Sequence, residues 1–135
     1  MDAEEFIELA KTKRRPIRRK FKDIGQRGYF ICDLEAATFM PQSDLPEKVF
    51  MLERMRWLGT EGILLYPHER PVGRVQYRFG YYMKARNGRW TWAQYCPMIY
   101  PEDLAELLSL AVREGTLLEE HMALVARAQQ IRAEH

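Results

Sequence analysis

The sequence predicts an α+β fold, in which a small, mostly antiparallel sheet of about four strands packs against three to four helices. Two observations predict this class. An Asn87-Gly88 pair inside a β-forming stretch indicates a long hairpin. Residues with the spacing of helix N-caps precede several apolar segments with helical periodicity. The expected order of helix, strand, helix, three strands and two helices implies an α+β domain with a mostly antiparallel sheet.

Length and composition indicate a single domain over residues 1–135, with residues 1–22 forming a helical and basic N-terminal extension. Of the 135 residues, 47% are hydrophobic, enough for a packed core. No apolar run approaches the roughly 18 residues of a membrane span. The first residues are acidic, unlike a secretory signal or a transit peptide. We therefore expect a soluble, cytoplasmic protein without a membrane partner.

The N-terminal segment is expected to form a helix followed by a strand. Asp2 and Glu5 have the spacing of a capping box, and the apolar residues after them recur at helical intervals. The helix is expected over residues 3–14, because Pro16 cannot continue it. Residues 29–34 are rich in β-formers and predict the first strand.

The segment after residue 43 is expected to form a second helix. Asp44 and Glu47 repeat the capping spacing, and Pro46 suits a first helical turn. Gly59 is a plausible helix stop, so the helix would end near residue 58. Residues 63–66 then predict a short strand, and the two prolines of 67–71 predict a loop.

The clearest element is a hairpin over residues 74–96. A two-residue type I′ turn at Asn87-Gly88 would place Lys84 opposite Thr91 and Met83 opposite Trp92. Alternation then predicts a core face, made of Val75, Tyr77, Phe79, Tyr81, Met83, Trp90, Trp92 and Cys96. It predicts an opposite, basic face, made of Gln76, Arg78, Tyr82, Lys84, Arg86, Arg89, Thr91 and Tyr95.

Two helices are expected to complete the chain. Pro101 and the acids after it are typical of a first helical turn, and Gly115 of a stop. Thr116 and Glu119 form another capping pattern, which predicts a last helix to about Arg132.

Charge is unevenly distributed along the chain. Residues 11–22 and 70–95 contain 14 of the 21 basic residues and none of the 19 acidic residues. An acid-free basic segment that follows Pro16 is typical of a phosphate-binding arm, although an inert solvated segment has the same composition. If both segments lie on one side of the fold, they form a surface for a polyanion.

Motifs for chemistry are mostly absent. The sequence has neither a phosphate-cradling loop nor a dinucleotide-binding fingerprint, so no cofactor is expected. Its histidines lack metal-ligand spacing, and no metal site is predicted. Asp33 and Glu35 alternate on one strand and, with His68 or Glu69, would resemble a metal-dependent nuclease site. Alternatively, the two carboxylates simply lie on the solvent-facing side of a strand end and bind no metal. Cys32 and Cys96 are both expected in the core.

These features predict a non-enzymatic nucleic-acid-binding protein, with single strands favoured. Basic side chains would contact phosphates and tyrosines would stack on bases. The predicted binding residues are Arg18, Arg19, Lys20, Arg78, Tyr82, Lys84, Arg86, Arg89 and Tyr95.

Arginine and tyrosine are also enriched at protein interfaces. The alternative hypothesis is therefore an adaptor or inhibitor whose basic aromatic face docks on an acidic protein partner, including a nucleic-acid enzyme. A metal-dependent nuclease is a third and more remote alternative.

Overall fold

The computed structural model describes residues 1–66, 72–93 and 95–134. The loop expected at 67–71, including His68 and Glu69, lies outside the described residues. In order, the elements are α1 (Ala3–Lys11), β1 (Ile17–Lys22), β2 (Gly28–Gln42), β3 (Leu45–Gly62), β4 (Val75–Lys84), β5 (Trp90–Trp92), α2 (Pro101–Arg113) and α3 (Glu119–Glu134). The α+β class is confirmed, with five strands rather than four and three helices in the described part.

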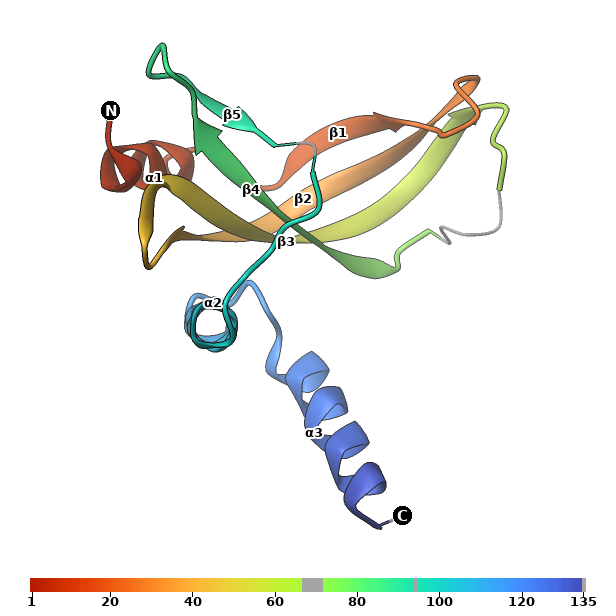
Figure 1. The fold of residues 1–135 in the computed structure, drawn as a ribbon. Helices are drawn as coiled ribbons and strands as arrows, with labels where there is room; N and C mark the ends of the chain where they lie inside the picture. Colours follow the sequence, from red (N-terminus) through yellow and green to blue (C-terminus); the bar gives the residue numbers. More distant parts are fainter. Residues whose placement is uncertain (67–71, 94, 135) are drawn as a thin grey trace.

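The five strands form one antiparallel sheet in the order β1-β2-β3-β4-β5. The sheet is curled, so its edge strands β1 and β5 approach each other across one face, which we call the inner face (Figure 1). Helix α1 packs on this inner face, where Ile7 joins Phe39, Val49 and Met51 in a buried cluster. Helix α2 covers the opposite, outer face, where Leu107 packs against Phe50.

The second helix predicted from the sequence is wrong, because residues 45–62 form β3. Ser43 and Asp44 make the tight turn between β2 and β3, with Gln42 paired to Leu45. Val49 and Met51 face inward whereas Phe50 and Leu52 face outward. Because helices cover both faces of the sheet, β3 is apolar on both sides and shows no simple alternation. The strand expected at residues 63–66 is also absent.

The basic segment after Pro16 is an edge strand rather than an arm outside the sheet. Residues Ile17 to Lys22 pair with β2, with Ile17 opposite Leu34 and Phe21 opposite Phe30. Lysine and arginine are common on edge strands, where charge discourages pairing with another chain. Helix α1 begins as predicted, with the Glu5 amide donating to Asp2 Oδ1 at 2.9 Å.

The hairpin between β4 and β5 turns at Asn87-Gly88, but not through a type I′ turn. Gly88 has φ of 86°, whereas Asn87 lacks the positive φ that type I′ requires. The Gly88 amide donates to Ala85 O, and the Ala85 amide donates to Arg89 O. These bonds define a three-residue loop with glycine in the left-handed position.

This loop shifts the register by one residue from the prediction. Tyr82 is opposite Trp92, Met83 opposite Thr91, and Lys84 opposite Trp90. A slip of one residue moves every side chain of a strand to the other face. Trp90 and Trp92 therefore lie on the inner face with Tyr82 and not on the predicted core face.

The two C-terminal helices are joined to the outer face at one corner. Gly115, with φ of 78°, ends α2 as predicted. The Arg54 guanidinium donates to the carbonyls of Gly115 and Thr116, and the hydroxyls of Thr38 and Thr116 lie 2.8 Å apart. From this corner α3 extends away from the sheet (Figure 1).

The two cysteines differ in their surroundings. Cys32 is fully buried as predicted, and this burial raises the pKa of its thiol to about 11. Cys96 is exposed in the segment after β5, so its predicted place in the core is wrong. The expected alternation carried the core face of β5 on to Cys96, but β5 ends at Trp92.

Candidate anion-binding pocket

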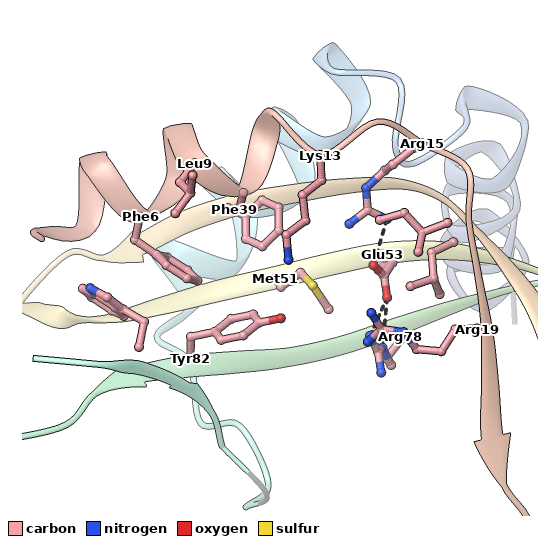
Figure 2. A pocket seen from close by; sticks show the side chains of 14 residues that line it. Phe6, Leu9, Lys13, Arg15, Arg19, Phe39, Met51, Glu53, Arg78 and Tyr82 are labelled. Carbon is pink, nitrogen blue, oxygen red and sulfur yellow. Dashed lines mark hydrogen bonds and ion pairs between the residues drawn. The ribbon is translucent and has the colours of Figure 1, made fainter.

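A pocket of about 230 Å³ lies between α1 and the inner face of the sheet; we call it the α1 pocket. Its lining includes four basic side chains and one carboxylate, from Lys13, Arg15, Arg19, Arg78 and Glu53. Lys13 and Arg15 follow α1, Arg19 lies on β1, Arg78 on β4 and Glu53 on β3. Residues far apart in the sequence thus converge on one hollow (Figure 2).

Glu53 lies at the floor of the pocket with only 2% of its side chain exposed. Two arginines bind its carboxylate from different sides. Arg78 donates through Nε and Nη2 to Oε1, at 3.1 and 2.6 Å, and Arg15 Nη1 donates to Oε2 at 2.9 Å. A buried carboxylate requires such charged partners, because desolvation strongly disfavours an unpaired charge. Glu53 therefore fixes both guanidinium groups in the pocket.

Arg78 is also held between two aromatic rings. Its guanidinium carbon lies 5.1 Å from the centre of the Phe21 ring and 5.0 Å from that of Trp92. Phe21 is on β1 and Trp92 on β5, so this contact joins the two edges of the sheet. Planar guanidinium groups stack well on aromatic faces and still donate hydrogen bonds in their own plane.

Lys13 and Arg19 supply the remaining positive charge. Both side chains are exposed at the rim, and neither forms an ion pair in the described part of the chain. Figure 2 shows Lys13 reaching from the chain after α1 into the pocket. With one carboxylate against four basic groups, the pocket has a formal charge of +3, which is suited to an anion.

An aromatic wall, formed by Phe6, Tyr82 and Trp90, borders the charged end of the pocket. The rings of Phe6 and Trp90 stack with centres 4.9 Å apart, and Tyr82 lies 5.1 Å from Phe6. The Tyr82 hydroxyl points towards the middle of the pocket (Figure 2). Burial raises the pKa of this hydroxyl, so it remains a hydrogen-bond donor at neutral pH.

Three of the residues predicted to bind nucleic acid, Arg19, Arg78 and Tyr82, line this pocket. The sequence predicted Tyr82 as an exposed surface on which bases stack. In the structure, its ring is packed among Phe6, Phe39 and Trp92.

Arg18 and Lys20 alternate with Arg19 on β1 and are paired with acids. Arg18 Nε lies 3.3 Å from Asp33 Oδ1, and Lys20 Nζ lies 2.6 Å from Glu61 Oε2. The hydrogen bond to Glu61 raises the pKa of Lys20. The positive charges of Arg18 and Lys20 are thus partly neutralised before any ligand arrives.

Three of the remaining predicted residues belong to the β4–β5 hairpin tip, which lies near the N-terminal end of α1. Lys84, Arg86 and Arg89 form the hairpin tip and make no ion pair among the residues described. Arg89 lines an open hollow of about 330 Å³ whose wall includes Phe6, Leu9 and Trp90. These three residues also line the α1 pocket, so the two hollows adjoin. Tyr95 lies after β5 with 82% of its surface exposed.

The two carboxylates considered for a nuclease site are both engaged by arginines. Glu35 accepts hydrogen bonds from Arg54 and Arg56, and Asp33 pairs with Arg18. Burial opposes ionisation of Glu35, but the bonds from Arg56 and Arg54 outweigh it and lower its pKa. Among the described residues, no cluster of three or more His, Cys, Asp or Glu side chains is placed to hold a metal ion.

Sequence reasoning missed Glu53, Phe6 and Trp90 as parts of the site. Glu53 interrupts the inward-facing series of Val49, Met51 and Met55, and an acid in such a series is a signal that a buried cation lies opposite. That signal is visible only once residues 45–62 are recognised as a strand. Trp90 was assigned to the wrong face by the hairpin register.

No family model, curated protein sequence or solved structure matches this chain. Within the described ranges, no helix has the length and apolar character needed to cross a membrane.

Proposed function

We propose that this protein binds single-stranded nucleic acid along its inner face and catalyses no reaction. The observation that carries the proposal is the convergence of Lys13, Arg15, Arg19 and Arg78 in one pocket beside an aromatic wall. Single-stranded nucleic acids are commonly bound by basic groups that contact phosphates and by aromatic rings that contact bases.

A path for a short strand is supported by the adjoining hollows. The hairpin tip offers Lys84, Arg86 and Arg89 at one end of α1, and Lys13 and Arg19 lie at the other end. Phe6 and Trp90 lie between these two basic groups. The path leaves out Arg18 and Lys20, because Asp33 and Glu61 already engage their charges.

A pair of double variants tests this path. Lys13→Gln with Arg19→Gln removes two unpaired charges from the pocket rim, whereas Arg18→Gln with Lys20→Gln removes two paired charges from neighbouring positions. Both variants change the net charge by the same amount. In a fluorescence anisotropy titration with a labelled single-stranded oligonucleotide, we expect the first pair to weaken binding about tenfold or more and the second to weaken it far less. Equal losses would indicate a diffuse charge effect and contradict the path.

An interaction module for an acidic protein is the second candidate, favoured by a separate observation. Tyr95 and Met98 lie close in sequence after β5 and are 82% and 81% exposed. Large apolar side chains that are exposed together often mark protein interfaces. A protein of this kind should purify without material absorbing at 260 nm, retain one acidic partner from a lysate, and lose that partner when Tyr95 and Met98 are replaced by serine. A nucleic-acid binder should carry such material and release it in high salt.

A further inference from the structure

The α1 pocket differs from the open groove that a continuous strand would need. Its lining comes from α1 and from all five strands of the sheet, so it is walled on several sides. Its volume of about 230 Å³ is smaller than that of a typical pocket for a small organic molecule. Such a hollow has room for one compact anionic group, whereas a strand that passed through it would need two wide openings.

The residues that line this hollow carry several donors, which suits an anion with several oxygens. Glu53 uses Nη1 of Arg15 and Nε and Nη2 of Arg78. Arg15 Nη2 and Arg78 Nη1 have no partner in the part of the chain that the structure describes, and both belong to guanidinium groups that Glu53 fixes. The Tyr82 hydroxyl and the Lys13 ammonium group add two further donors (Figure 2).

The charge of the pocket favours a doubly charged group. A phosphodiester within a strand carries one negative charge, whereas a phosphomonoester carries about 1.5 to 2 at neutral pH and offers three strong acceptor oxygens. Against a formal pocket charge of +3, the monoester gains more electrostatic attraction and accepts more hydrogen bonds than the diester.

We propose that the α1 pocket binds the terminal phosphomonoester of a single-stranded nucleic acid, so that the protein recognises a phosphorylated strand end. This inference rests on the proposed function and assigns the pocket within it. Lys13, Arg15, Arg19 and Arg78 contact the phosphate, and Glu53 is a positioning residue that holds the two guanidinium groups. The nucleotide attached to the phosphate leaves the pocket beside Phe6 and Trp90, towards the hairpin tip.

The direct test compares oligonucleotides of one sequence that differ only at their ends. Wild-type protein is titrated with strands that carry a 5′-phosphate, a 3′-phosphate or hydroxyl groups at both ends, each with an internal fluorophore. We expect one phosphorylated strand to bind at least about tenfold more tightly than the hydroxyl strand, the ratio typical of one charge-assisted hydrogen bond.

Variants show whether this ratio arises in the pocket. Lys13→Gln with Arg19→Gln should bring the ratio close to one. Arg86→Gln with Arg89→Gln should weaken binding of all three strands and leave the ratio unchanged, because the hairpin tip contacts the strand away from its end. Glu53→Gln raises the formal charge of the pocket but releases Arg15 and Arg78, so we expect the ratio to fall because the two guanidinium groups lose their fixed positions. A rise in the ratio would contradict the positioning role of Glu53. The ratio is measured only on folded protein, and the rim variant tests the pocket even if Glu53→Gln does not fold.

The outcomes separate this inference from the proposed function. Equal binding of all three strands overturns the recognition of a strand end but leaves nucleic-acid binding in place. If none of the strands binds, the proposed function itself is wrong. A nucleoside monophosphate serves as the competitor that distinguishes a strand end from a free nucleotide. If it binds as tightly as the phosphorylated strand, the pocket is a mononucleotide site and the strand-end assignment is overturned.

Discussion

Arg78 holds the inner face together. Its guanidinium donates two hydrogen bonds to Glu53 and lies between the rings of Phe21 and Trp92. A side chain of β4 therefore contacts both edge strands, β1 and β5, at once. A lysine would keep the charge but lose the planar stacking and the two hydrogen bonds that converge on Glu53 Oε1. Arg78 therefore supplies positive charge to the pocket and also contacts side chains of β1, β3 and β5 across the inner face.

Gly80 shows how closely the β4–β5 hairpin is packed. The Trp92 ring lies directly over it, and a Cβ atom at residue 80 would be 2.2 Å from the Cη2 atom of Trp92. Glycine within a strand often marks such a close approach. We expect Gly80→Ala to displace the Trp92 ring and to lower the free energy of unfolding by about 1–3 kcal/mol, measured by chemical denaturation.

The matched control is Gly59→Ala, at a strand glycine with no atom within 4 Å of an added Cβ. This variant should be neutral or stabilising by less than about 1 kcal/mol. If Gly80→Ala is as stable as Gly59→Ala, then Trp92 does not pack over β4.

At the level of elements, helix α1 belongs to the core of the sheet even though it adjoins a basic segment. Ile7 is buried against the inner face, whereas Leu9 on the same helix is 53% exposed. We expect Ile7→Ala to lower the free energy of unfolding by about 2–5 kcal/mol and Leu9→Ala to change it by less than about 1 kcal/mol. Thermal or urea denaturation of the two variants measures this contrast. Similar, small effects of both substitutions would mean that α1 is a detachable extension, as the sequence had suggested.

Elements with local end signals were predictable from the sequence. The cap at Asp2 begins α1, and Gly115 stops α2, because these residues act through bonds and dihedral angles within a few positions. Strand β3 was not predictable in this way. It is buried on both faces, so its apolar run is equally compatible with a helix, and the turn at Ser43-Asp44 resembles a helix cap.

The hairpin register was missed for a more specific reason. An Asn-Gly pair suits both a type I′ turn and a three-residue loop that ends in a left-handed glycine, and the two differ by one residue of register. In the predicted register Trp90 lies on the same face as Tyr81 and Met83. In the observed register, one residue away, Trp90 lines the α1 pocket. The candidate site was therefore predicted only in part: Arg19, Arg78 and Tyr82 were identified, whereas Glu53 and Trp90 depended on tertiary pairing.

For the whole molecule, folding redistributes the charge seen along the sequence. The two acid-free segments do meet, because Arg15 and Arg19 from one and Arg78 from the other line the same pocket. Other basic side chains of these segments lie outside the pocket. Arg18 and Lys20, for example, pair with acids on β2 and β3. Five of the basic side chains along the proposed path have no ion pair in the described structure, namely Lys13, Arg19, Lys84, Arg86 and Arg89.

The salt dependence of binding tests the central claim most directly. Each phosphate neutralised on a single strand contributes about 0.7 to the slope of log K against log salt concentration. Lys13 and Arg19 share one phosphate, so the five side chains neutralise about four phosphates and predict a slope of roughly −2.8. The measurement titrates wild-type protein with a single-stranded oligonucleotide at several salt concentrations around the physiological value. Binding at physiological salt with a slope near this value is the expected result. Absence of binding there, or an affinity that does not change with salt, would contradict the claim that the inner face binds nucleic acid.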